Sequence, residues 1–413
     1  MQIPISLRHR KFAIFWIGIA FAWTANQVLI WAIPWHIRTF SDYPLALGAV
    51  GLIRLVPTVL ASLFAGVIAD KFNRRKVVLM TQGTMGLVAL LLGLFTFSGK
   101  IELWLIYLLL MIQATAYVFD LPARYSITPN IVPIKALSNA LSVEFIAIQI
   151  GALIGPILSG ALINQFGQSA AYLAASLLFS VMLVALLLMG EVPQERLETT
   201  QKQVDWAAIK DGISFTFKHP LIFPSMLLDF LATLLTRADS LMPYFARDVL
   251  GLNAAQYGWL SAASAMGASS AALILTQIRQ IRRQGGLLLG SVAMIGIAAV
   301  VFGTSRSFPI SMLALIVAGA SDSVSSIIRS TIRQLNTPDK LRGRMTSVNQ
   351  IFFMGGPYLG DVKNGFLGAT IIGVPLAVAL GGAVCIASVG WVAHRWPGLR
   401  RYDGGQSINA EIN

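Results

Sequence analysis

The chain has 413 residues, of which 56% are hydrophobic and 12% charged, and its mean hydropathy is +0.71. A soluble domain cannot bury this much apolar side chain, so the composition excludes a soluble enzyme and predicts a protein whose solvent is lipid. One Cys and four His without ligand spacing predict neither a disulfide nor a metal site, and no nucleotide or cofactor fingerprint is present.

Apolar runs of about 20 residues, long enough to cross roughly 30 Å of hydrocarbon, are the main pattern. The first begins near residue 12 and is too long for a removable signal peptide, so we interpret it as a membrane helix. The predicted spans are 12–37, 45–69, 77–98, 101–123, 141–164, 168–190, 221–246, 255–278, 285–304, 309–331, 345–366 and 370–393. The sequence therefore predicts an all-α membrane protein with twelve transmembrane helices.

One long polar stretch, residues 191–219, interrupts the chain near its middle and predicts a cytoplasmic linker. It divides the chain into a six-helix bundle over 1–190 and a second over 220–394, followed by a cytoplasmic tail over 395–413. Two short segments support a duplication at an offset of about 205 residues, because the loop 70–76 corresponds to 277–283, and Val132-Pro133 corresponds to Thr337-Pro338.

The cations predict the orientation of these spans. Of the 31 Lys and Arg, 24 lie in stretches that would face the cytoplasm if the amino terminus is inside. Five would lie in outer loops, and these are Arg38, Lys100, Arg247, Arg306 and Lys363. Cytoplasmic loops carry the excess of Lys and Arg, so both termini are expected inside. The net charge of +13 is then a topology signal facing anionic lipid, and no nucleic-acid partner is indicated.

The loop after the second span resembles the signature of the major facilitator superfamily, G-x-x-x-D-[RK]-x-G-[RK]-[RK]. Asn73 stands where Gly is usual, and Asn also tolerates a left-handed turn. Asp70 can face the positive end of a helix, and a Gly allows close helix approach. The resemblance implies a cytoplasmic latch that stabilises one conformation, formed by Gly66, Asp70, Lys71, Arg74 and Arg75.

The loop after the fourth span, with Asp120 and Arg124, resembles the branch of this superfamily that contains the enterobactin exporter and macrolide efflux proteins. A second-half loop with Arg342, Gly343 and Arg344 resembles the same branch. The resemblance implies two pseudo-symmetric six-helix bundles of a secondary transporter, with Asp120 and Arg124 joining the latch.

The fifth span carries small residues every four positions, at Ala147, Gly151, Gly155 and Ser159, with Pro156 beside them. Such a ladder permits close helix contact, and Pro156 breaks one backbone hydrogen bond. With Gly151, Gly155 and Pro156 the span resembles the antiporter signature G-x-x-x-G-P-x-x-G-G. Ordinary helix packing is the alternative interpretation.

Polar side chains within the spans are the remaining signal, since a charge at a helix centre costs about 3 kcal/mol on insertion scales. We interpret Asp229 first and Asp322 second as carriers of a proton, and Arg54 or Arg237 as holding an anionic cargo or pairing with these carboxylates. Asp322, Ser325, Ser326 and Arg329 share one helix face by their spacing. The other pathway candidates are Asn26, Gln27, Gln113, Gln149 and Asp239. A structural role is the alternative for each residue, including an ion pair of Asp229 with a cation such as Arg54.

These features predict a bacterial inner-membrane transporter, without enzyme activity or cofactor, that exports a small amphipathic molecule such as a siderophore or a drug by proton antiport. Its expected partners are that molecule, protons and membrane lipid, and it is expected to be a monomer. The alternatives are a lysophospholipid flippase or a uniporter of the same fold and, from another class, a membrane sensor or assembly factor that transports nothing.

Overall fold

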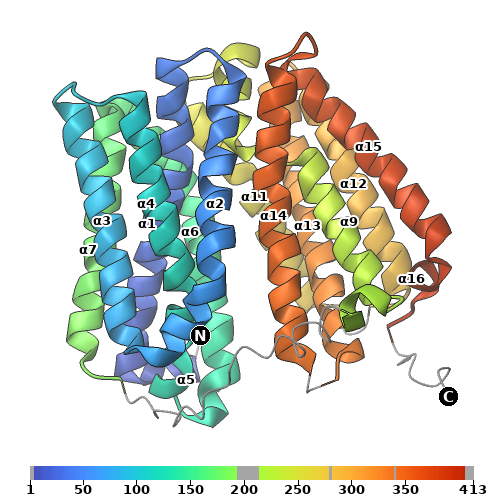
Figure 1. Cartoon of the computed structure of the whole chain (residues 1–413), viewed down its shortest axis with the longest axis horizontal. Coiled ribbons are helices and arrows are strands. Elements are labelled where there is room, and N and C mark those ends of the chain that lie inside the picture. Colours follow the sequence, from blue (N-terminus) through green and yellow to red (C-terminus); the bar gives the residue numbers. More distant parts are fainter. Residues whose placement is uncertain (1–3, 193–213, 279–280, 339–340, 405–413) are drawn as a thin grey trace. The chain divides into compact units, whose positions relative to one another are not determined.

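The computed structural model describes residues 4–192, 214–278, 281–338 and 341–404, and their regular structure is helical (Figure 1). Twelve helices of at least 15 residues are described. They are α1 (Arg10–Phe40), α2 (Pro44–Lys71), α3 (Arg74–Phe97), α4 (Leu103–Tyr125), α6 (Ile134–Phe166), α7 (Gln168–Met189), α9 (Ile222–Thr236), α11 (Ala254–Thr276), α12 (Gln284–Thr304), α13 (Phe308–Asn336), α14 (Arg342–Gly368) and α15 (Gly373–Arg395). Short helical segments are η1 (Ile5–Arg8), α5 (Thr128–Ile131) and α16 (Pro397–Arg401).

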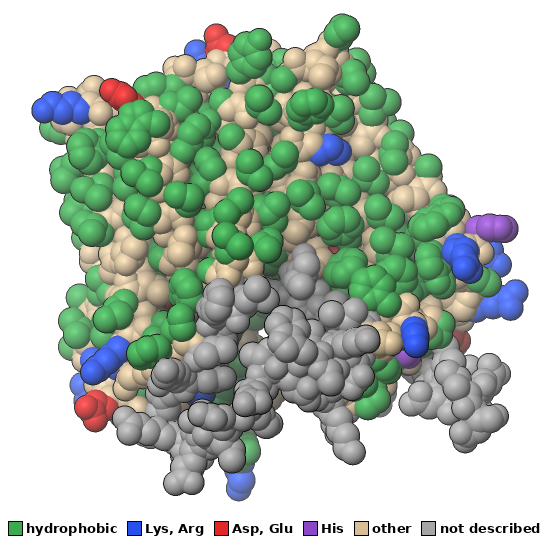
Figure 2. Space-filling model, in the orientation of Figure 1, with side chains coloured by type: hydrophobic (Ala, Val, Ile, Leu, Met, Phe, Trp, Pro, Cys, Tyr) green, Lys and Arg blue, Asp and Glu red, His purple; other side chains and the backbone are tan. Residues whose placement is uncertain are grey.

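The helices have the surface of a membrane protein. Ten of them contain segments long and apolar enough to cross a bilayer. Large apolar side chains such as Leu177, Leu188 and Leu273 are exposed, and Figure 2 shows hydrophobic side chains over most of the visible face, with Lys and Arg mainly toward the helix ends. The predicted all-α membrane fold with helices near the expected positions is confirmed.

The prediction of one continuous seventh span over 221–246 is wrong. Helix α9 ends at Thr236, Arg237 is extended, and the chain continues through η2 (Asp239–Leu241), α10 (Met242–Tyr244) and the π-helical turn η3 (Phe245–Val249). Side chains of α14 bind the freed backbone: Asn364 Nδ2 donates to the Arg237 carbonyl at 2.7 Å, and Asp361 accepts from the Ser240 amide at 3.2 Å. Hydropathy does not register this break because partners on another helix replace the lost helical bonds.

The chain forms two compact units. Unit 1 comprises Met1–Leu197 with Met242–Ala262, and unit 2 comprises Glu198–Leu241 with Ala263–Asn413. The break in α9 and η2 therefore lie in unit 2, and the chain passes into unit 1 at Met242. The division of the chain into bundles over 1–190 and 220–394 stays a prediction.

In unit 1, α1 packs on α6 and α7, and α3 packs on α4 and α7. Apolar side chains from α1, α3, α4 and α7 form one buried core, including Phe15, Val78, Ala123, Met182 and Leu186. Burial of these apolar residues fixes how α1 and α4 are rotated. It therefore also fixes where the polar side chains between the apolar positions stand.

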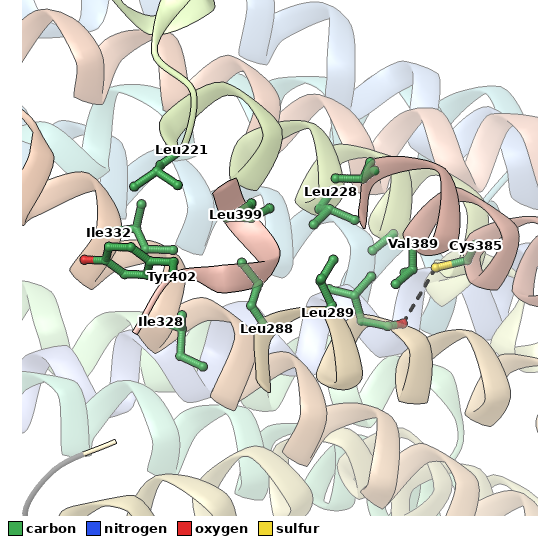
Figure 3. Close-up of a cluster of buried hydrophobic side chains, with 13 residues drawn as sticks. Leu221, Leu228, Leu288, Leu289, Ile328, Ile332, Cys385, Val389, Leu399 and Tyr402 are labelled. Carbon is green, nitrogen blue, oxygen red and sulfur yellow. Dashed lines mark hydrogen bonds between the residues drawn. The ribbon is translucent and has the colours of Figure 1, made fainter. Parts of the chain in front are cut away.

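In unit 2, a buried core joins α9, α12, α13, α15 and α16, and Figure 3 shows Leu228 and Ile328 within it. Cys385 Sγ lies 3.8 Å from the Val292 carbonyl in the same cluster. Leu228 directly precedes Asp229, and Ile328 directly precedes Arg329. Packing of the two apolar residues therefore fixes the helix rotation at which the two charged side chains stand.

The expected duplication recurs in the packing inside each unit. In unit 1 a Cβ at Gly151 would lie 2.9 Å from the Thr24 amide of α1, so only Gly allows this approach. In unit 2 a Cβ at Gly360 would lie 2.8 Å from the Thr233 carbonyl of α9. Gly155 and Gly360 are 205 residues apart, as are Gly151 and Gly356, so α6 on α1 and α14 on α9 are the same contact made twice.

Asn73 does not use the left-handed conformation that its type tolerates. Its φ is −62°, and its side chain caps α3 by accepting a hydrogen bond from the Lys76 amide at 3.1 Å. Asn is a preferred N-cap residue, and helix capping therefore explains its presence in the loop.

Two of the cations assigned to outer loops lie in long helices instead. Arg38 is buried in the last turn of α1 and binds both carboxylate oxygens of Asp248, at 2.9 and 2.8 Å. Lys363 lies on α14, and its Nζ donates to the Leu235 carbonyl at 2.7 Å. Each is tolerated inside a helix because an acceptor of the same unit satisfies it.

Candidate functional site

A chain of ion pairs joins α9 to α13 in unit 2. Arg329 Nη2 lies 2.8 Å from Asp229 and 3.8 Å from Asp322. Arg237 lies 3.4 Å from the other oxygen of Asp322 and 3.1 Å from Asp239. We call these five residues the Arg329 cluster. It contains both predicted proton carriers, Asp229 and Asp322, and two of the predicted pathway residues, Arg237 and Asp239.

Helical spacing places one edge of the Arg329 cluster. Asp322, Ser325 and Arg329 follow one another at intervals of three and four on α13, and Arg329 Nη1 donates to Ser325 Oγ at 2.6 Å. The shared face predicted from the sequence is confirmed for these three residues. Asp229 approaches the same guanidinium from α9, about 10 Å along that helix from its first residue by the helical rise.

The Arg329 cluster changes from dry to wet along its length. The side chains of Arg329 and Asp229 are 3% and 5% exposed, whereas those of Arg237 and Asp322 are 35% and 37% exposed. Asp322 is shared between the two arginines. The buried end, Arg329 with Asp229, is an ion pair that is costly to break. The exposed end, Arg237 with Asp322, is accessible to water or to a polar solute.

This arrangement can couple a proton to a side-chain movement. When Asp229 binds a proton, it loses the negative charge that attracts Arg329. The guanidinium then keeps Ser325 and Asp322 as acceptors. When the proton leaves, the short pair with Asp229 forms again. The sequence named Arg54 as an example of a cation that could pair with Asp229; within unit 2 the cation paired with Asp229 is Arg329. The sequence did not identify this partner because α9 and α13 are far apart in the chain.

Arg124 of α4 is a buried arginine in unit 1, and we call its surroundings the Arg124 cluster. Arg124 Nη2 lies 2.5 Å from Asp120 on the same helix, and its guanidinium stands 5.4 Å from the Trp23 ring. Asp120 is fully buried and accepts hydrogen bonds from Thr81 and Gln82, each at 2.9 Å. The predicted neighbours Asp120 and Arg124 are thus brought together, one helical turn apart.

The remaining pathway candidates are only partly brought together. Asn26 and Gln113 are buried and share a hydrogen bond of 2.8 Å between α1 and α4. Gln27, Gln149 and Arg54 are half-buried, and Arg54 makes no ion pair within the described part of the chain. An interhelical hydrogen bond is the structural alternative foreseen for Asn26.

The predicted latch is described in part. Arg74 donates to the Ser126 carbonyl at 3.1 Å and Arg75 to the Leu186 carbonyl at 2.8 Å, so both tie α3 to neighbours in unit 1. The side chains of several other predicted positions lie outside the described residues. These are Gly66, Asp70, Lys71, Arg342, Gly343 and Arg344.

Sequence reasoning missed Asp361, Lys363 and Asn364, which bind the backbone around the break in α9. The duplication offers a signal that could have found them. The offset of 205 residues aligns α14 with the glycine ladder of α6, where Asp361 and Asn364 correspond to Pro156 and Ser159. Strongly polar replacements in a repeated apolar segment mark a position where the second copy has acquired new partners.

Residues 4–409 match the family described as transmembrane secretion effector, MFS_3. The chain belongs to this family. It is 29% identical over 325 residues to the enterobactin exporter EntS of Escherichia coli O81 (strain ED1a), covering 78% of this chain and 77% of the relative. The family consists of transporters, so this family member is a multi-pass secondary transporter rather than an enzyme.

Solved structures agree with the fold of this family member. A bacterial homolog of the human lysosomal transporter Spinster, inward-facing and unoccupied, aligns with a TM-score of 0.70 at 14% identity, covering 96% of this chain and 97% of that one. A D-xylose–proton symporter aligns with a TM-score of 0.70 at 12% identity, covering 94% and 97%. At these identities the likeness is one of fold, which is the major facilitator fold, and the resemblance seen in the sequence motifs is confirmed.

Proposed function

We propose that this transporter exports a small amphipathic molecule from the bacterial cytoplasm by proton antiport. The two bundles would expose a central site alternately to each side of the inner membrane, with both termini in the cytoplasm. Kinship with the enterobactin exporter supports export of a siderophore or a drug-like molecule. The Arg329 cluster is the observation that carries the proposal.

The coupling step uses Asp229 as the proton carrier. With Asp229 ionised, the short pair with Arg329 holds α9 to α13. A proton arriving from outside neutralises Asp229 and weakens this link, which lowers the barrier to rearranging the two helices. Asp322 receives the released guanidinium, so no unpaired cation is left in the membrane. Arg237, at the wetter end, is positioned to meet an anionic group of the cargo.

The test uses the full chain in proteoliposomes with an imposed pH gradient. Enterobactin is the first probe and a fluorescent amphipathic dye the second. We expect uphill accumulation by the wild type and its loss in Asp229→Asn, with downhill exchange retained. Glu102→Gln is the matched control, because Glu102 is an exposed carboxylate whose partner is Trp104.

Each other outcome identifies a rival. Flux that equilibrates without responding to the pH gradient indicates a uniporter, and movement of a lysophospholipid alone indicates a flippase. Binding without flux indicates a sensor. Uphill transport of wild-type magnitude in Asp229→Asn, in a protein of unchanged stability, would remove Asp229 from the mechanism and leave Asp322 as the candidate.

A further inference from the structure

Glu144 is a buried carboxylate on α6 in unit 1 that the mechanism above does not use. It is 4% exposed. One of its oxygens accepts a hydrogen bond from the hydroxyl of Thr128, the fully buried first residue of α5. Among the described residues, no Lys or Arg lies within ion-pair distance of Glu144. The three acids of the Arg329 cluster, Asp229, Asp239 and Asp322, differ from it because each contacts a guanidinium.

The cation whose charge reaches Glu144 is paired with another acid. Arg124 is the charged group that faces it from α4, and Arg124 is paired with Asp120 and lies over a Trp ring. Arg74 and Arg75 of α3 donate to backbone carbonyls, and Arg8 of η1 is exposed.

In the described part of the chain, the other neighbouring helices bring no charged group that compensates Glu144. Helix α1 presents Trp16, whose indole donates to the Val143 carbonyl at 2.7 Å, and Trp23. Helices α5 and α7 contain no Asp, Glu, Lys or Arg. The remaining titratable neighbour is Tyr125, at the end of α4.

An ionised carboxylate without a cation is strongly disfavoured in such a place, whereas a protonated carboxyl group needs only hydrogen-bonding partners. A Thr hydroxyl can supply such a partner to either form of the acid. We propose that Glu144 is a second proton-binding site, which carries a proton in this arrangement and releases it to water when helix movement exposes it or brings Arg124 to it.

The site has a built-in competition. Arg124 stands between two acids, Asp120 on its own helix and Glu144 on α6. With Glu144 protonated, Arg124 is paired with Asp120. With Glu144 ionised, the same guanidinium is attracted to both, and the junction of α4, α5 and α6 is strained toward a new arrangement. The role of this proton in transport rests on the proposed antiport function, but its binding does not.

The test is infrared difference spectroscopy of the full-length protein in liposomes, titrated from acid to alkaline pH. A protonated carboxyl group has a carbonyl band that an ionised one lacks. We expect the wild type to show such a band at neutral pH and Glu144→Gln to lose it, while Glu102→Gln keeps it. Glu144→Asp should shift the band, which identifies the residue if the Gln variant folds poorly.

Transport measurements then separate this proposal from the proposed function. We expect Glu144→Gln to keep uphill flux but to exchange one proton fewer per substrate, whereas Asp229→Asn loses uphill flux. If the carbonyl band of protonated carboxyl groups is the same in wild type and Glu144→Gln at neutral pH, Glu144 is ionised and the proposal is overturned. Uphill flux in Asp229→Asn would contradict the role of Asp229 and leave the infrared result on Glu144 intact.

Discussion

Each unit has a buried arginine at a corresponding position, and the two arginines are paired differently. Arg124 and Arg329 are 205 residues apart, lie on α4 and α13, and each bonds to the residue four positions earlier on its own helix. In unit 1 that residue is Asp120, so the charge is neutralised within one helix. In unit 2 it is Ser325, a neutral acceptor, and the counter-charge must come from elsewhere.

The closest counter-charge in unit 2 comes from α9, while Asp322 of α13 lies farther from the guanidinium, at 3.8 Å. Thr24 of α1 and Asp229 of α9 are also 205 residues apart, so a neutral position in unit 1 is a carboxylate in unit 2. Moving the acid from the arginine's own helix to a neighbouring helix converts a local contact into a link between helices. A link of that kind responds to protonation by loosening two elements, whereas the local pair does not.

The largest expected effect is that of Arg329→Gln. The substitution leaves Asp229 buried without its cation, and breaking such a pair costs about 3–5 kcal/mol. We expect a lower thermal midpoint in detergent and no uphill flux.

The double variant Asp229→Asn/Arg329→Gln is the control for that loss. It removes both charges, so we expect it to recover most of the stability while uphill flux stays absent. Recovery of uphill flux in the double variant would contradict a coupling role for this pair.

A transplant of the unit 1 pattern into unit 2 should affect transport more than stability. Ser325→Asp/Asp229→Thr gives Arg329 a carboxylate on its own helix and removes the acid from α9. Since charge is conserved and the arginine stays paired, we expect a folded protein with downhill exchange and no uphill accumulation. Vesicle flux with and without a pH gradient measures this, and wild-type coupling in the transplant would mean that the position of the acid is unimportant.

The corresponding pair in unit 1 should show a smaller effect. Asp120→Asn/Arg124→Gln retains hydrogen-bonding side chains for Thr81 and Gln82, so we expect a loss of about 1–2 kcal/mol, in the range of one or two hydrogen bonds. Transport should slow several-fold, as expected of a weakened latch, but remain uphill. If this variant equilibrates its substrate without accumulation, the distinction between the two arginines is wrong.

The smallest effect is expected for an arginine that pairs with an exposed acid. Arg38 binds fully exposed Asp42 as well as Asp248. The hydrogen bond from Arg38 lowers the pKa of Asp42 below its ordinary value. The stabilisation is therefore present above that ordinary value and is lost as the pH falls through the lowered pKa. We expect Asp42→Asn to lower the thermal midpoint slightly and by the same amount at every pH between 6 and 8. Asp248→Asn, which leaves buried Arg38 with only the exposed Asp42 as an acidic partner, should lower it more.

The amino-acid sequence by itself determined the membrane class, the approximate positions of most helices and the transporter family. Apolar run length suffices for the first two because each helix satisfies its own backbone bonds. It also determined which residues of α13 share a face, since helical spacing is a local property. Asp322, Ser325 and Arg329 could therefore be grouped from the sequence.

Only the tertiary structure decided which helices those faces meet. The partner of Asp229 is Arg329, 100 residues away, and no local rule relates the two positions. The break after Thr236 was hidden for the same reason, since the groups that permit it, Asp361 and Asn364, stand on α14. Burial of Glu144 likewise arises from helices packed around it. Pairing, breaks and desolvation depend on neighbours distant in sequence, and the packed chain alone brings those neighbours together.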